Sequence, residues 1–262
     1  MRKLHAVLLC GCVLLAGCSF GGGTATPEPT ADTPASTLQT GNAPPGVSAE
    51  TRNLTNATEL LVAHAETLSD SGFVLELGSD ATVARNGETR RVTRQQVIRA
   101  ESGATEYNFT VRNPNSRFDA WGNETTQAVR AQANDRTRYQ LGESQSPATL
   151  SGTQVIAQYL AAGNWSVSDV RAEDGTQLVT LRSTTVPGAS TAVPQGASDV
   201  RNYEAVVVVD SEGRVHSFEV TADYTIEGED ATFSRTLELT STSGVEVDRP
   251  GWFADAVAAS DS

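Results

Sequence analysis

Apolar residues recur along the chain with two different periods. In residues 54–71 apolar or small residues return at every third or fourth position, which predicts a helix that ends at Gly72. Asn56 and Thr58 are alternative N-caps for this helix, because both side chains can accept a backbone hydrogen bond. The same spacing in residues 149–162 predicts a second helix.

Most of the remaining sequence alternates apolar and polar residues with a period of two, which is typical of strands that have one dry and one wet face. Asn86 and Gly87 predict a hairpin turn, since both tolerate a positive φ. The clearest alternation lies in residues 203–240 and predicts an antiparallel meander. One face of the last two strands of this meander carries Phe218, Val220, Ala222, Tyr224, Ile226, Phe233, Leu237 and Leu239.

A sheet with one apolar face must cover that face, and the two predicted helices are the evident cover. The sequence therefore predicts an α+β fold, in which a curved antiparallel sheet or open half-barrel carries two helices over its concave apolar face. Arg235 has the same parity as Phe233 and Leu237. We therefore expect this arginine at the rim of the concave face.

The N-terminus has the pattern of an export signal. Two basic residues precede the apolar residues 6–15, a run that is too short for the ~20 residues of a membrane-spanning helix. The tetrapeptide that ends at Cys18 (LAGC) resembles the lipobox of bacterial-type lipoproteins, in which this cysteine carries a lipid. We predict a signal peptide over residues 1–17 and a lipid on Cys18 that anchors the protein to the extracellular face of the cell membrane. An ordinary secretory cleavage site is the alternative, and the export route stays open.

Residues 18–52 contain five of the ten prolines together with many Gly and Thr residues. Such a segment buries too little apolar surface to offset its chain entropy, so we predict a disordered tether. The folded domain is expected over residues 53–253 and a C-terminal tail over residues 254–262.

The charge balance excludes some partners. The chain has 32 acidic and 19 basic residues, a net charge of −13, and Lys3 is its only lysine. This balance argues against nucleic-acid binding and against charge-driven docking on an anionic lipid surface. A GC-rich genome would favour arginine over lysine, and a salt-rich environment would favour an acidic surface. Together these features resemble haloarchaeal proteins.

No pattern in the chain predicts catalysis, a cofactor or a metal site. Apart from one histidine in the signal region, the chain has only His64 and His216, and neither has ligand-like neighbours. Nucleophile, phosphate-binding and dinucleotide-binding motifs are missing from the sequence. Five N-x-S/T sequons, a mild excess over chance, suit an exported protein and are candidate N-glycosylation sites. These sites are Asn53, Asn56, Asn108, Asn123 and Asn164.

The order of helix, strands, helix and closing meander resembles the carrier superfamily that contains LolA and the LppX and LprG lipoproteins. Residues 204–220 look like its paired strands, and residues 236–252 look like its closing strand with a proline-containing end. The lipobox, the tether and the domain together also resemble a class of haloarchaeal surface lipoproteins. The resemblance implies a half-barrel that holds an acyl chain or another apolar ligand. The candidate lining residues are Phe218, Val220, Tyr224, Phe233, Leu237 and Leu239. The alternative function is a structural or interaction module of the cell surface that has no small-molecule ligand.

Overall fold

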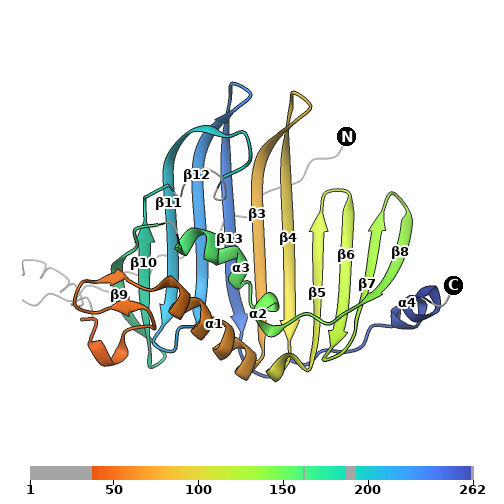
Figure 1. Ribbon diagram of the computed structural model, residues 1–262, viewed down its shortest axis with the longest axis horizontal. Helices are drawn as coiled ribbons and strands as arrows, with labels where there is room; N and C mark the ends of the chain where they lie inside the picture. The colour runs from red at the N-terminus through yellow and green to blue at the C-terminus, as the bar shows by residue number, and fades with distance from the viewer. Residues whose placement is uncertain (1–36, 162, 187–192, 261–262) are drawn as a thin grey trace, which may run out of the picture. The chain divides into compact units, whose positions relative to one another are not determined.

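A thirteen-stranded antiparallel sheet organises the part of the chain that the computed structural model describes, residues 37–161, 163–186 and 193–260. The strands are β1 (Val47–Ser48), β2 (Asn53–Leu54), β3 (Phe73–Arg85), β4 (Glu88–Ala100), β5 (Glu106–Asn113), β6 (Ser116–Asn123), β7 (Gln127–Ala133), β8 (Arg136–Gly142), β9 (Ser166–Glu173), β10 (Thr176–Ser183), β11 (Ser198–Asp210), β12 (Val215–Ile226) and β13 (Glu229–Ser241). Their order in the sheet is β1-β2-β9-β10-β11-β12-β13-β3-β4-β5-β6-β7-β8. Because β1 and β8 are the two edges and do not pair with each other, the sheet is open (Figure 1).

The sheet consists of two meanders, β3–β8 and β9–β13, which join where β13 pairs with β3. At this seam Leu237 lies opposite Leu77, and Phe233 lies opposite Ala81. Directly opposed residues of antiparallel strands point to the same face. The seam therefore continues one apolar face from the second meander into the first.

Three helical segments lie on that face, which we call the helix-side face (Figure 1). The helices of the described residues are α1 (Ala57–Ser71), α2 (Pro147–Leu150), α3 (Thr153–Leu160) and α4 (Phe253–Ser260), with short 3₁₀ turns at Thr40–Asn42 and Ser102–Ala104. The chain leaves β8 at one side of the sheet and must return to β9 near the opposite edge. This connection crosses the helix-side face and carries α2 and α3 with it.

The main core lies between these helices and the strands beneath them. Leu60 and Leu68 of α1 and Ile156 of α3 are buried against it. Tyr159 of α3 contacts Phe218 of β12, with ring centroids 5.2 Å apart. Full burial of each such side chain contributes ~1.5–3 kcal/mol, so this layer supplies most of the apolar stabilisation.

Both predicted helices exist, with corrected boundaries. The first begins only at Ala57, because Asn56 is the N-cap and its side chain accepts a hydrogen bond from the Glu59 amide. The predicted second helix is broken into α2 and α3 at Gly152, which has φ +75°. A Cβ at Gly152 would lie 2.7 Å from Leu237 Cδ1. Glycine is therefore required here both by the positive φ and by the close packing against β13.

Two other predicted boundaries are wrong. Part of the predicted tether is folded, because Leu38 and Val47 are 5% and 7% exposed and pack in the core. Part of the predicted C-terminal tail forms α4. The phenyl ring of Phe253 meets Trp121 edge-on, with ring centroids 5.0 Å apart. Trp121 lies next to the helix-side residue Ala120 in β6 and therefore faces the other side of the sheet, which places α4 on the opposite face.

The fold confirms the predicted α+β class with a large antiparallel open sheet. The helix cover is, however, incomplete. Helices α1–α3 lie over β9–β13 and reach β3 and β4, whereas β5–β8 extend beyond them (Figure 1). After β8, the connection to α2 is attached to β5, because the backbone amide of Gln145 donates a hydrogen bond to the Tyr107 hydroxyl at 2.8 Å.

Candidate functional site

A polar row interrupts the apolar helix-side face at the seam between the two meanders. Ser79 of β3 lies opposite Arg94 of β4 on one side and opposite Arg235 of β13 on the other. The three side chains therefore share one face. The next row along the strands consists of Gln96, Leu77 and Leu237.

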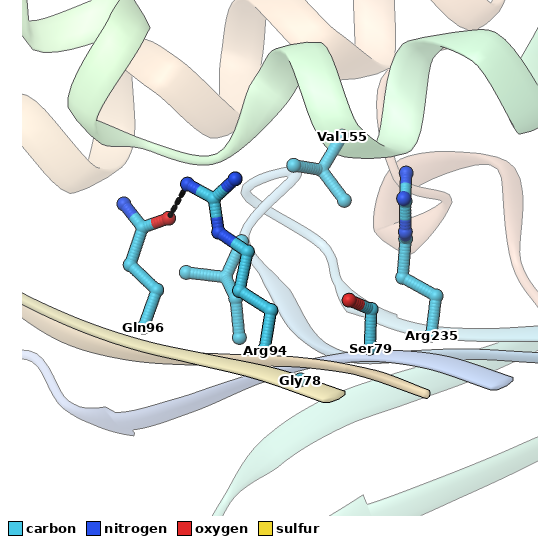
Figure 2. A pocket seen from close by; sticks show the side chains of 7 residues that line it. Gly78, Ser79, Arg94, Gln96, Val155 and Arg235 are labelled. Atoms are coloured by element: carbon cyan, nitrogen blue, oxygen red, sulfur yellow. Dashed lines mark hydrogen bonds between the residues drawn. The ribbon is translucent and has the colours of Figure 1, made fainter. Parts of the chain in front are cut away.

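A pocket of about 230 Å³ lies over these rows and under α3. Figure 2 shows Arg94 and Arg235 rising from the sheet on either side of the Val155 side chain, which points down from the helix. The pocket is lined by Leu77, Gly78, Ser79, Arg94, Gln96, Val155 and Arg235. It thus combines apolar walls with two guanidinium groups, a hydroxyl and an amide, and its lining contains no acidic residue.

Both arginines contact neighbouring side chains. One Nη of Arg94 donates to Gln96 Oε1 at 3.5 Å (Figure 2). The guanidinium of Arg235 lies 5.9 Å from the ring centre of Tyr159 and 5.8 Å from that of Phe233, in cation–π geometry. Burial raises the pKa of Tyr159 although the positive charge of Arg235 opposes this shift. The pocket therefore presents two permanent cations beside neutral aromatic groups.

A partly exposed apolar surface adjoins the pocket on the uncovered strands. Val111 of β5 lies opposite Gln96 on one side and Phe118 of β6 on the other, and Phe118 lies opposite Ala131 of β7. Phe118 is 38% exposed, although it points to the helix-side face. We call Phe109, Val111, Phe118, Val129 and Ala131 the β5–β7 patch.

The strands from β4 to the β8 edge of the sheet also differ in charge. Residues 88–142, which span β4–β8, contain nine arginines and six acidic residues, a net charge of +3 in a chain whose net charge is −13. The helix-side face of these strands carries Arg90, Arg94, Arg136 and Arg138. The buried Asp119, by contrast, lies on the opposite face, where it pairs with Arg117 and Arg130.

Sequence reasoning missed Arg94 and the pocket. The alternation Val92, Arg94, Gln96, Ile98 places Arg94 on the apolar face, and this is the signal that could have found it. The expectation for Arg235 was better, because this residue does border a pocket on that face. Of the candidate lining residues, Leu239 is partly buried and the other five are buried in the core. These five are Phe218, Val220, Tyr224, Phe233 and Leu237. None of the six borders the pocket, and their contact with a ligand stays a prediction.

A buried histidine holds α1 and the α2–α3 junction together. His64 Nδ1 accepts a hydrogen bond from the Val215 amide at 3.1 Å, so Nε2 carries the proton and donates to the Ser151 carbonyl, also at 3.1 Å. Burial lowers the pKa of His64 to about 4. Nearby, burial alone would raise the pKa of Asp210, but hydrogen bonds from His216 and Arg214 hold it below its usual value.

This arrangement does not resemble a metal centre. Within the described residues no group of three or more His, Cys, Asp or Glu side chains could hold a metal ion. His64 uses both ring nitrogens for backbone contacts, and Asp210 accepts from Arg214, His216 and the Glu212 amide. His64 thus joins α1 to Ser151 between α2 and α3 and to β12, whereas His216 pairs with Asp210 within the sheet.

The other predicted sites stay predictions. Cys18 and the signal peptide lie outside the described residues. Asn53 and Asn164 are exposed, while Asn56 is exposed but serves as the helix cap. Asn108 is half-buried in β5, and the side-chain oxygen of Asn123 accepts from the amides of Thr125 and Thr126. None of the described helices is both long and apolar enough to cross a membrane.

The fold and pocket define an α+β protein with an open antiparallel sheet and a helix layer over part of one face. The chain belongs to the family of unknown function DUF7537, whose model matches residues 3–256. No curated protein matches the chain.

Among solved structures, the Mycobacterium tuberculosis lipoprotein LppX is similar at 14% identity and a TM-score of 0.35, covering 72% of this chain and 98% of that one. An outer-membrane lipoprotein-sorting protein domain from Vibrio parahaemolyticus is similar at 10% identity and a TM-score of 0.27, covering 77% of this chain and 99% of that one. A LolA superfamily protein from Nitrosomonas europaea is similar at 12% identity and a TM-score of 0.24, covering 74% of this chain and 94% of that one.

Proposed function

We propose that the protein is a membrane-anchored lipoprotein of the cell surface whose domain binds an apolar or lipid ligand on the helix-side face. The pocket between α3 and the seam is the observation that carries this proposal. Its lining residue Gln96 lies opposite Val111 of the β5–β7 patch, where Phe118 leaves apolar surface in contact with solvent. Exposed apolar surface next to a pocket is typical of a ligand-binding site.

The size of the pocket restricts how a ligand would lie. Ligand pockets usually measure ~300–1,000 Å³, and this pocket of about 230 Å³ is smaller. It therefore holds one end of the ligand, and the remainder lies over the β5–β7 patch. The buried residues beneath α1 and α3 keep their packing in this arrangement.

The anchor belongs to the same proposal. A lipid on Cys18 would attach the chain to the extracellular side of the membrane, and residues 19–36 would connect it to the folded part, which begins by Leu38. Replacement of Cys18 by serine should release the protein from membranes into the medium. Retention of the Cys18→Ser variant on the membrane would contradict the lipid anchor.

Ligand binding is tested with a variant that fills the pocket. Val155→Trp places a large ring where the pocket now lies, whereas Val62→Trp, at a position 49% exposed on α1, adds the same ring outside it. Native mass spectrometry of protein extracted from its host should show a bound apolar molecule in the wild type and in Val62→Trp but not in Val155→Trp. Absence of a ligand from all three would favour the alternative, an interaction module without a small-molecule ligand.

A further inference from the structure

We infer that the pocket binds the anionic headgroup of an amphiphile, a carboxylate or phosphate held between Arg94 and Arg235, while its acyl chain lies over the β5–β7 patch. This inference rests on the proposed function and names the ligand class for the same site. It goes beyond a general apolar ligand because it assigns an orientation and two charged contacts.

The geometry of the row supports a two-sided grip. Arg94 and Arg235 both lie opposite Ser79, so their Cα atoms are two strand spacings apart, about 10 Å. Both side chains rise toward α3 on either side of the pocket (Figure 2). An anion below the Val155 side chain can accept hydrogen bonds from the guanidinium groups that flank the pocket, which match carboxylate and phosphate oxygens, and from the Ser79 hydroxyl.

The electrostatics select the sign of the headgroup. Two cations border one small pocket whose lining contains no carboxylate. Their mutual repulsion is unfavourable and is relieved when an anion enters between them. No ion pair involves Arg94 within the described part of the chain, and the residue is exposed. The local net charge of +3 on β4–β8 would also draw an anion toward this half of a strongly acidic protein.

The position of the acyl chain follows from the neighbouring rows. Gln96 borders the pocket, and the next residues across the sheet are Val111, Phe118 and Ala131. This line leads away from α3 over strands that the described helices do not cover. A chain that leaves the pocket here covers the exposed ring of Phe118. On the other side of the pocket, the rings of Tyr159 and Phe233 pack beside Arg235 and leave no corresponding path for the chain.

The test measures binding of three ligands to the mature full-length protein; the ligands share an apolar chain and differ in the headgroup. Decanoate, decyl phosphate and methyl decanoate carry the same ten-carbon chain, and calorimetry at low ionic strength measures their affinities. We expect the two anions to bind at least tenfold more tightly than the ester, because charged hydrogen bonds are lost with the ester. Acetate and inorganic phosphate, the headgroups without a chain, should bind at least tenfold more weakly than the amphiphiles.

The variants locate the charge recognition. Arg94→Gln and Arg235→Gln should each weaken decanoate binding about five- to tenfold and leave binding of the ester unchanged. Arg235→Lys keeps the charge with less disturbance of the packing around Tyr159, and should retain part of the preference for the anion. Arg90→Gln is the matched control, since Arg90 shares the strand and face of Arg94 but does not border the pocket.

The outcomes separate this inference from the proposed function. Equal binding of ester and anion, unchanged in Arg94→Gln and Arg235→Gln, overturns the headgroup assignment and leaves an apolar ligand in place. Equal binding of acetate and decanoate overturns the amphiphile and leaves a simple anion site. A failure of all chain-bearing ligands to bind contradicts the proposed function itself.

Discussion

Two phenylalanines on the same face of the sheet differ in how far their side chains are exposed to solvent. Phe218 in β12 is 1% exposed and touches Tyr159 of α3, whereas Phe118 in β6 is 38% exposed. Both lie in antiparallel strands with alternating side chains. The difference arises because the connection from β8 to β9 brings α2 and α3 over one half of the sheet and leaves the other half open (Figure 1).

The same division appears in the charges. The uncovered strands β5–β8, residues 106–142, contain five arginines and four acidic residues, a net charge of +1, although the whole chain carries −13. The covered half is thus an apolar core in an acidic surround, and the open half is apolar with basic groups beside it. Two regions with the same kind of strand pattern therefore differ in packing: the first is buried beneath helices and stabilises the fold, and the second leaves apolar surface exposed to solvent.

The largest expected effect separates the two phenylalanines. Phe218→Ala should lower the free energy of unfolding by about 3–5 kcal/mol, because it leaves a cavity in a packed core. Phe118→Ala should lower it by less than about 1 kcal/mol, because the ring is already partly in water. Denaturant titration of both variants measures the difference. Equal losses would mean that the open half is packed as firmly as the covered half.

Acid should weaken the covered half through His64. Its pKa of about 4 in the folded protein lies below the ordinary 6.5, so folding favours the neutral ring. The stability from this group is complete above pH 6.5 and is lost as the pH falls toward 4, by about 3 kcal/mol in total. Asp210, Arg214 and His216 are the charged or titratable groups around it.

Thermal unfolding at a series of pH values checks this sign. The His64→Gln variant has no titrating group at this position and should show a much flatter stability profile between pH 6.5 and 4. If wild type and variant change in parallel over this window, other groups cause the acid sensitivity.

The opposite face of the open half depends on α4. Trp121 meets Phe253, and Trp252 stacks on Tyr139 with ring centroids 6.4 Å apart. Phe253→Ala should cost about 1–2 kcal/mol, because it removes an aromatic contact and part of the cover over Trp121. Hydrogen exchange should accelerate in β7 and β8 and not in β11 and β12. A uniform acceleration would show that the two halves unfold as one.

The smallest effect is expected on the outer surface. Arg182 and Glu204 form a solvent-exposed ion pair between β10 and β11, with 3.0 Å between Nη2 and Oε1. Arg182→Ala should change the unfolding free energy by less than about 1 kcal/mol. A larger loss in calorimetric unfolding would mean that the comparison of the halves overlooks an electrostatic contribution from this face.

The sequence predicted the class of fold well because local periodicity records which side of a strand is dry. The alternation that ends at Leu239 and the spacing around Ile156 both correspond to real elements. The boundaries were less predictable. The break at Gly152 depends on its approach to Leu237, and the folding of Leu38 onto the core depends on strands far away in the chain.

The candidate site was predictable only in part. Parity placed Arg235 on the apolar face, and its pocket confirms that it borders an opening there. Arg94 becomes its neighbour only because β13 pairs with β3, and this pairing joins segments about 160 residues apart. No local pattern reports such a pairing. For the same reason, alternation could not show that Phe118 stays exposed while Phe218 is buried.

The most direct test of the account is the position of a bound amphiphile. A crystal structure of the mature protein with a bromine-labelled fatty acid would locate the chain by the anomalous signal of bromine. We predict a carboxylate between Arg94 and Arg235, with the bromine over Phe118 on the β5–β7 patch. Bromine density away from the helix-side face, or a carboxylate bound elsewhere while the pocket stays empty, would contradict the account.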